Sequence, residues 1–346
     1  NIYKFIVLMI SFLSLVLLGI ILFCVLYCIL KAIQYFTFEP FVKVAQNIDS
    51  ELPEKNKTLT LLQYNCFWRP WLLHLGTREY VPERSRDLSQ RLDEYDIVCL
   101  NESFHFGSNV VKKFIKTMQS KGFKYIATTD RVPILSKWII DSGVMILSKY
   151  PIIERDAINY KSGTSFDQFA MKSCLYAKIQ ISKTQHVNVF ATHLQASYEV
   201  ETQTDFNVRA SQVKDIHTLM MRHSSDTSPS FLLGDMNVAN SNQKEYGEMI
   251  NGLQLPNYNL IDTFGTIEHK MSTIITDESL QYIDESKTPK SGNVDPRTID
   301  YVFVFESKEK SQLSEYKAEV EAMQVSGKPY SQLSDHRAVK CVIQFL

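Results

Sequence analysis

Six short apolar runs, each with a polar residue at one end, constrain this chain more than any other feature. The runs are Leu59–Tyr64 before Asn65, Ile97–Leu100 before Glu102, Val187–Thr192 before His193, Phe231–Gly234 before Asp235 and Asn237, Tyr301–Phe305 after Asp300, and Ala338–Phe345 after Asp335 and His336. Short runs of β-branched and aromatic residues are typical of buried strands, and ligand sites form beyond strand ends. The pattern therefore predicts a sheet-based core with carboxylates, amides and two imidazoles at its strand ends.

The segments between these runs predict helices and further strands. Helical spacing of apolar residues predicts helices over Pro82–Tyr95, Val110–Ser120 and Phe206–Arg222, and strand-like runs cover Val144–Leu147 and Leu175–Ile181. This alternation from Thr58 onward is typical of a single α/β domain. The polar stretch His269–Pro296 lacks periodicity and predicts a long loop, and such loops are often functional.

The N-terminal part of the chain is different in character. No charged residue occurs from Phe5 to Leu30, and Lys4 and Lys31 bracket this stretch. The 26 residues would form a helix about 39 Å long, which exceeds the roughly 30 Å hydrocarbon core of a bilayer. A signal peptide is the alternative, but its apolar region is shorter and precedes a small-residue cleavage site. We expect a single-pass membrane helix, with the side of the membrane left open because lysines flank both ends.

These features divide the chain into three parts and limit its partners. We expect a transmembrane helix with flanks over residues 1–37, a juxtamembrane linker over 38–57 and a globular domain over 58–346. The formal net charge of −1 gives no overall basic field, so nucleic acid is not the expected partner. The spacing of the six cysteines does not suggest a disulfide framework, and buried thiols are expected instead.

Taken singly, each polar residue has a structural explanation. Glu102 could be a turn residue or a helix cap, and His193 could be a hydrogen-bonded core histidine. Gly234-Asp235-Met236-Asn237 has the composition of a turn. The joint order of these residues along the chain carries more information than any one of them.

That order resembles the endonuclease/exonuclease/phosphatase superfamily, also called the deoxyribonuclease-I-like fold. The motifs that carry the resemblance are Gln63-Tyr64-Asn65, Leu100-Asn101-Glu102, Thr192-His193-Leu194, Gly234-Asp235-Met236-Asn237, Ile299-Asp300-Tyr301 and Ser334-Asp335-His336. They extend from Thr58 to the C-terminus. The resemblance implies a four-layer α/β sandwich, with two central mixed β-sheets flanked by helices, here preceded by the N-terminal transmembrane helix.

Within the superfamily the chain looks most like the neutral sphingomyelinases, which are magnesium-dependent enzymes of the phospholipase C type. Two segments carry this narrower resemblance, Asp141–Ile152 and Asp167-Gln168-Phe169-Ala170-Met171-Lys172. In that family the lysine of the second segment approaches the substrate phosphate, and the aspartate sets its position. Ser173 stands where the family usually has glycine. A solvated charge at a strand end is the alternative for Lys172.

The resemblance implies a Mg²⁺ site and a set of catalytic roles. Glu102, with Asn65, would hold the ion, and Mn²⁺ is the alternative metal. Asp335 would contribute to metal binding or orient His336. Asp235 would bind a second metal or help to protonate the leaving group.

The remaining predicted roles concern proton transfer and the phosphate. His336 would be the general base that activates water, since an imidazole can titrate near neutral pH. Asp300 would accept a hydrogen bond from its ring and fix the tautomer. His193 and Asn237 would donate hydrogen bonds to the phosphoryl oxygens. Lys172, positioned by Asp167, would bind the same group.

The resemblance implies hydrolysis of sphingomyelin to ceramide and phosphocholine at a membrane surface. The rivals are a nuclease of the abasic-site or deoxyribonuclease type, an inositol-phosphate phosphatase of the same superfamily, and a catalytically inactive binding module. The membrane helix, the near-neutral charge and the Asp167/Lys172 element count against the nuclease. The Pro-Ala-Trp-Cys-Asp-Arg run of the inositol-polyphosphate 5-phosphatases does not occur. Every core position is filled, which disfavours an inactive module, and the residues predict no oligomeric state.

Aromatic residues after the first motif allow two interpretations. Phe67, Trp68 and Trp71 could contact a membrane interface, where tryptophan is favoured, or they could pack in the core or line the cleft.

Overall fold

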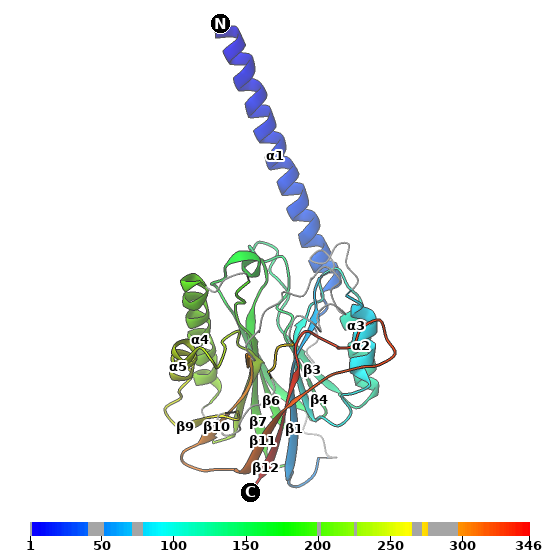
Figure 1. Ribbon diagram of the computed structural model, residues 1–346, viewed down its shortest axis with the longest axis vertical. Helices are drawn as coiled ribbons and strands as arrows, with labels where there is room; N and C mark the ends of the chain where they lie inside the picture. Colours follow the sequence, from blue (N-terminus) through cyan, green and yellow to red (C-terminus); the bar gives the residue numbers. More distant parts are fainter. Residues whose placement is uncertain are drawn as a thin grey trace.

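Two six-stranded β-sheets pack face to face and form the centre of the globular domain (Figure 1). The structure is a computed structural model that describes residues 2–40, 52–70, 79–198, 202–224, 227–264, 272–275 and 297–346. The first sheet has the order β11 (Leu313–Glu321), β12 (Ala338–Phe345), β1 (Thr58–Trp68), β2 (Ile97–Ser103), β4 (Met145–Ser148) and β3 (Tyr125–Thr128). The second has the order β5 (Ile152–Asn159), β6 (Ser173–Gln180), β7 (His186–His193), β8 (Ser230–Asp235), β10 (Asp300–Ser307) and β9 (Tyr258–Asp262).

Each sheet contains one parallel pair among antiparallel ones. The pair β1/β2 is parallel in the first sheet, and β7/β8 is parallel in the second. Helices α2 (Val81–Ser89) and α3 (Val110–Ser120) cover the outer face of the first sheet, while α4 (Gln203–His223) and α5 (Gln243–Gly252) cover the second (Figure 1). This arrangement confirms the predicted four-layer sandwich with two mixed sheets.

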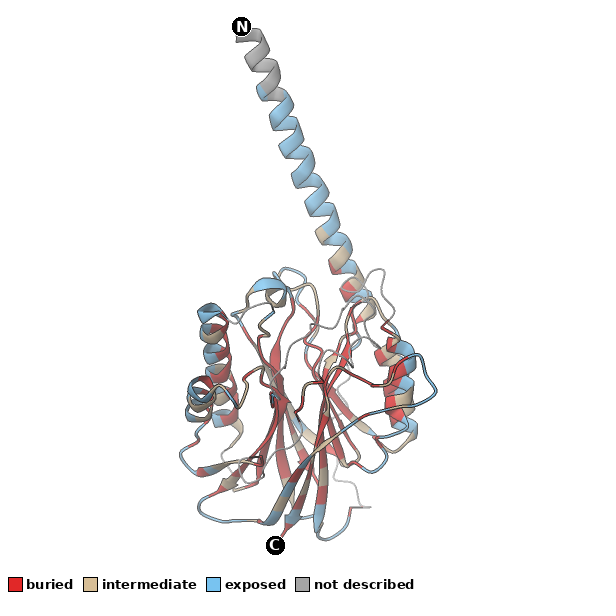
Figure 2. Cartoon of the chain, in the orientation of Figure 1, coloured by how far each residue is buried: buried red, intermediate tan, exposed pale blue. Residues whose placement is uncertain are grey.

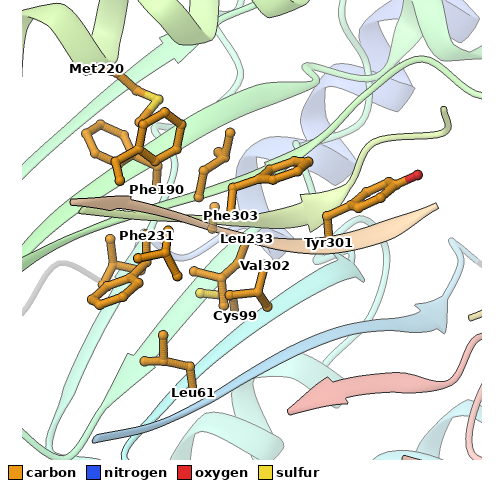
Figure 3. Packing of buried hydrophobic residues seen from close by; sticks show 14 of the residues in the cluster. Leu61, Cys99, Phe190, Met220, Phe231, Leu233, Tyr301, Val302 and Phe303 are labelled. Atoms are coloured by element: carbon orange, nitrogen blue, oxygen red, sulfur yellow. The ribbon is translucent and has the colours of Figure 1, made fainter. Parts of the chain in front are cut away.

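Strand alternation decides which residues of the first sheet reach the centre. Leu59 and Leu61 of β1 belong to the cluster between the sheets, while Leu62 and Tyr64 pack in the cluster with α2 and α3. Figure 3 shows Leu61 near residues of the opposite sheet, and Figure 2 shows the strands largely buried. Because side chains alternate along a strand, the inner face of β1 continues from Leu59 and Leu61 to polar residues at its end.

Most predicted elements are present within a few residues of their expected ends. The predicted helix Pro82–Tyr95 is an exception, because α2 ends at Ser89. Beyond it the backbone N–H groups of Arg91 and Tyr95 donate to carbonyls three residues earlier, as in turns, and Leu92 and Tyr95 are still buried. The buried apolar residues thus continue beyond the end of the helix, in a segment that forms turns. Most of the predicted loop His269–Pro296 lies outside the described residues, apart from 272–275.

Helix α1 (Ile2–Thr37) projects away from the domain, and its side chains from Ser11 to Leu26 are exposed (Figure 2). The part from Ser11 to Thr37 is long and apolar enough to cross a membrane, a property that a signal sequence shares. Its end meets the domain, where Phe38 is buried against the ring of His105. Most of the predicted linker lies in residues 41–51, outside the described part of the chain.

Two of the aromatic residues after the first motif are described by the structure, and both lie in the interior. Phe67 and Trp68 are buried, and the Trp68 ring packs edge-on against Phe114 with ring centroids 4.9 Å apart. The core interpretation therefore holds for these two residues, and Trp71 lies outside the described residues. All four cysteines of the described strands, Cys66, Cys99, Cys174 and Cys341, are buried free thiols, as expected.

The close approach of β7 and β8 gives a testable prediction about Gly234. A Cβ atom at this position would lie 2.2 Å from the carbonyl oxygen of Thr192. Gly234→Ala should therefore separate the two strands and lower the free energy of unfolding by about 1–3 kcal/mol or more, the usual cost of overpacking. The control is Gly247→Ala in α5, where a Cβ has open space and should stabilise the helix by about 0.5–1 kcal/mol. Thermal unfolding of both full-length variants checks the prediction, and equal midpoints would contradict it.

Candidate functional site

The predicted polar residues gather at one edge of the two sheets. Within the second sheet, strand register places Asp235 of β8 opposite both Asp300 of β10 and His193 of β7. The first sheet contributes Asn65 near the end of β1 and Glu102 near the end of β2. Asp335 and His336 come from the segment just before β12. Side chains separated widely in the sequence therefore meet across the gap between the sheets.

His336 is held by two carboxylates of the opposite sheet. Its Nδ1 lies 2.8 Å from Oδ2 of Asp300, and its Nε2 lies 3.8 Å from Oδ2 of Asp235. Burial alone would lower the pKa of His336, but the negative charges of Asp300, Asp235 and Asp335 outweigh it and hold the pKa well above its usual value. The surrounding carboxylates therefore favour the charged imidazole.

Asn65 links carboxylates from both sheets. Its Nδ2 donates to Oε1 of Glu102 and to Oδ2 of Asp235, each at 3.0 Å. Its Oδ1 accepts from the backbone N–H of Phe67 at 3.1 Å. The carboxamide therefore holds the two carboxylates in place from its nitrogen side.

The backbone conformation of Glu102 directs its side chain into the site. Alternation along β2 puts Val98 and Leu100 on the face that packs against the helices, and Glu102 would follow them. Its φ of 56° places it in the left-handed region, which is uncommon for a residue with a Cβ. The side chain instead reaches Asn65. Such strain persists where the surroundings enforce it and is frequent at functional sites.

Asn237 follows β8 in the same left-handed conformation, with φ 50°. Its backbone N–H donates to Oδ1 of Asp235 at 2.9 Å, and its Nδ2 donates to the carbonyl of Leu194 at 3.1 Å. The turn that follows β8 is thus fastened to Asp235 and to the residue after His193.

His193 is buried and uncharged. Its Nε2 lies 3.6 Å from Oδ2 of Asp235, and its Nδ1 has no hydrogen-bond partner among the described residues. Burial, followed by the positive charges of Lys172 and His336, holds the pKa of His193 well below its usual value. A neutral imidazole here can donate one hydrogen bond to a ligand.

The buried Lys172 forms an ion pair beside the site with Asp167, which is half-buried. The Lys172 Nζ lies 3.1 Å from Oδ2 of Asp167 and donates to the carbonyl of Leu194 at 2.6 Å. Asp167 also accepts from the backbone N–H of Ala196 and from the hydroxyl of Tyr198. The alternative of a solvated lysine is wrong, since Lys172 is only 4% exposed.

The carboxylates of the site crowd one another. Burial, and then repulsion from Asp335, raises the pKa of Glu102. Burial, and then repulsion from Asp300, raises the pKa of Asp235 to about 7. Asp335 itself accepts from the hydroxyl of Ser334 at 3.2 Å. A divalent cation would relieve this repulsion, and carboxylate oxygens are the ligands that Mg²⁺ prefers.

One group of described residues has a donor set that could hold a divalent metal. Single ligand atoms of Asp235, Asp300 and His336 lie within 4.8 Å of one another. Of the sequence-based ligands, Asn65 and Glu102 lie in β1 and β2 of the first sheet, and Asp335 lies just before β12. Their metal-binding role stays a prediction, since Asn65 presents its nitrogen to Glu102 in this structure.

Two buried amides beneath the site were not assigned roles from the sequence. Asn101 donates to the carbonyl of Thr192 and accepts from the backbone N–H of Asp235 and from Nε2 of Gln63. Gln63 also lies 3.5 Å from Oδ1 of Asp300. Polar residues on the buried face of an apolar strand were the available signal, because such a face tolerates them only when they are hydrogen-bonded.

A buried ion pair supports the loop that follows β7. Arg209 of α4 pairs with Glu245 of α5 and donates to the carbonyl of Gln195. Gln212 accepts from the backbone N–H of Gln195. The loop that carries Leu194 and Ala196, and so steadies Lys172 and Asp167, is thereby fixed to α4.

Most of the chain matches one known protein family. The sequence pattern of the Endonuclease/Exonuclease/phosphatase family matches residues 62–336, which include every residue of the site. The chain belongs to this family. Membership explains the joint order of the motifs along the sequence and agrees with the predicted superfamily.

Several curated relatives within the family are named for lipid hydrolysis. A sphingomyelinase of Dictyostelium discoideum is 36% identical over 132 residues, covering 36% of this chain and 29% of its own. A sphingomyelinase C of Bacillus cereus is 33% identical over 223 residues, covering 59% of this chain and 66% of its own. The chain thus matches less than two thirds of the length of these relatives.

Solved structures show the same fold. The crystal structure of SmcL superposes with a TM-score of 0.66 at 20% identity, covering 83% of this chain and 99% of SmcL. A Staphylococcus aureus beta toxin variant with bound magnesium ions gives a TM-score of 0.63 at 23% identity, with coverage of 83% and 99%. A TDP2 from C. elegans gives 0.57 at 14% identity, covering 85% of this chain and 77% of TDP2. The architecture is therefore that of the family.

The amide network beneath the site gives a second prediction. Asn101→Ala removes the partner of three buried groups, and each unpartnered group costs about 1–3 kcal/mol. We expect the free energy of unfolding to fall by about 3 kcal/mol or more, measured by chemical denaturation of the full chain. The matched control is Asn207→Ala on the exposed face of α4, which should change it by less than about 0.5 kcal/mol. A small effect for Asn101→Ala would mean that the network contributes little.

Proposed function

We propose that this chain is a membrane-anchored, Mg²⁺-dependent phosphodiesterase that hydrolyses sphingomyelin to ceramide and phosphocholine. The buried Lys172, held by Asp167 beside a carboxylate-rich site, is the observation that carries the proposal. A fixed cation in this place suits a substrate phosphate that would otherwise be repelled. The curated sphingomyelinases that resemble the chain support the choice of lipid.

The roles of the residues follow from their contacts. Asp300 accepts from Nδ1 of His336, which leaves Nε2 facing the site as the atom that takes the proton from water. The same carboxylates raise the pKa of His336, and a bound cation would oppose that effect and favour the neutral base. His193 and Asn237 would donate hydrogen bonds to the phosphoryl oxygens as these gain charge.

The metal belongs on the carboxylates of the first sheet. Glu102 and Asp335, with Asn65, would hold Mg²⁺, and Mn²⁺ could occupy the same oxygens. A bound divalent cation supplies electrostatic stabilisation of the phosphate and the departing alkoxide. Asp235, with its pKa of about 7, is suited to give a proton to that alkoxide.

Anchorage by α1 fits this substrate. A helix that crosses the bilayer confines the domain to a thin layer at the lipid surface, which raises the local concentration of head groups. An overall charge of −1 also gives no general attraction for DNA.

The test is release of phosphocholine from sphingomyelin in mixed micelles at neutral pH by the full-length chain. Activity is expected with Mg²⁺ and should be lost in EDTA and restored by added Mg²⁺. His336→Ala and Asp300→Asn should each lower kcat by about 10²–10⁴-fold, because one removes the base and the other its tautomer control. An abasic-site DNA duplex serves as the competing substrate, and cleavage of DNA without lipid cleavage would overturn the lipid assignment.

Lys172 gives a separate prediction that bears on the substrate phosphate. Lys172→Met should lower kcat/KM for sphingomyelin by about 10²-fold or more, since it removes the charge-assisted contact proposed for the substrate phosphate and leaves the charge of Asp167 without its cation. The matched control is Lys183→Met, because Lys183 is exposed and pairs with Glu54 at the surface. Equal kcat/KM values for the two variants would argue against a phosphate-binding lysine.

A further inference from the structure

Large apolar side chains are exposed at one end of the domain, beside α1. Outside α1, seven large apolar side chains of the described residues are exposed, and five of them, Ile134, Leu135, Phe166, Phe169 and Tyr198, lie in this region. We refer to these five as the apolar rim. Leu135 is 96% exposed, and a concentration of such side chains marks an interaction surface more often than a chance arrangement.

Hydrogen bonds connect the parts of the rim. The backbone N–H groups of Ile139 and Ile140 donate to the carbonyl of Phe169, which joins the loop of residues 131–138 to η2 (Ser165–Phe169). The rings of Phe166 and Tyr198 meet edge to face at 6.4 Å. Figure 1 shows η2, coloured green, at the end of the domain from which α1 leaves.

Helix α1 is bonded directly to the loop that carries Ile134 and Leu135. Nζ of Lys31 donates to the carbonyls of Pro133 and Trp138, at 2.8 and 2.5 Å. The hydroxyl of Tyr27 donates to the carbonyl of Ser136 at 2.7 Å. These contacts fix the direction of the helix relative to the domain.

The contacts also fix the depth of the loop. Tyr27 precedes Lys31 by four residues, so it lies about 6 Å further along the helix into the uncharged segment. Its hydroxyl also lies 3.4 Å from the carbonyl of Ile134. If α1 crosses a bilayer, the tip formed by Ile134 and Leu135 lies at the level of the lipid interface. Arg131 and Lys137 flank this tip and tie it to its surroundings. The Arg131 guanidinium donates to the carbonyl of Tyr35 in α1 and stacks on its ring, and Nζ of Lys137 donates to the carbonyl of Lys161.

The rim also borders the site. The hydroxyl of Tyr198 donates to Asp167, the partner of Lys172. A lipid that moves along the rim would therefore bring its phosphate to Lys172 without leaving the interface.

We propose that the apolar rim is a second membrane-contact surface, which inserts into the interface of the bilayer that α1 crosses. The occupant is the lipid bilayer rather than a protein, because the rim is continuous with α1 and its tip is bonded to a residue within the apolar segment. The inference rests on the proposed membrane anchorage by α1, but not on the identity of the reaction.

The test measures depth directly. The exposed Cys24 and Cys28 are changed to serine, which leaves the four buried cysteines, and a nitroxide is attached to Leu135→Cys in the full-length chain. After reconstitution into phosphatidylcholine vesicles, collision of the nitroxide with oxygen and with a water-soluble nickel complex is compared. Position 135 should show a severalfold higher ratio of oxygen to nickel accessibility than the control Lys310→Cys, in the exposed turn between β10 and β11.

A label at a third position tests the membrane anchorage by α1 separately from membrane contact by the rim. Leu18→Cys reports whether α1 is in the bilayer. A high ratio of oxygen to nickel accessibility at position 18, with a water-like ratio at position 135, would overturn the proposed membrane contact of the rim. It would leave the anchorage by α1 intact. A water-like ratio at both positions would overturn both. Because Leu135 is almost fully exposed, its replacement should not disturb folding.

Discussion

Packing of the two inner sheet faces is the constraint on which the site depends. Leu59 and Leu61 of the first sheet belong to the same buried cluster as Val302 of the second. The same faces continue into polar residues at the strand ends. Because a rigid apolar interface fixes the distance between the sheets, Asn65 can contact Asp235 and His336 can contact Asp300 across it. The site is thus an extension of the core, with hydrogen bonds replacing apolar contacts.

The strands and most helices could be predicted from the sequence because their signals are local. Each apolar run is long enough to define a strand, and the polar residue at its end marks where the sheet stops. Lys172 and Asp167, singled out in one short segment of the sequence, form an ion pair in the structure. The metal ligands and catalytic roles remain predictions.

The features that could not be predicted depend on contacts between distant segments. The end of α2 at Ser89 cannot be read from apolar spacing, because Leu92 and Tyr95 stay buried in a turn. The raised pKa of His336 arises from three carboxylates brought together by folding, whereas the sequence suggested an imidazole that titrates near neutrality. Asn101 was visible as a polar residue in a strand, but its three partners come from β1, β7 and β8.

The direct bonding of α1 to residues 133–138 has a consequence for how the protein meets its substrate. A domain on a slack tether could swing and search a patch of membrane while its anchor stayed still. Here Lys31 and Tyr27 join helix and domain, so the two turn and travel as one body. If α1 crosses a bilayer and the substrate is a lipid, as proposed, encounters with new lipids are set by lateral diffusion in the plane of that bilayer. Turnover would therefore depend on membrane viscosity as well as on chemistry.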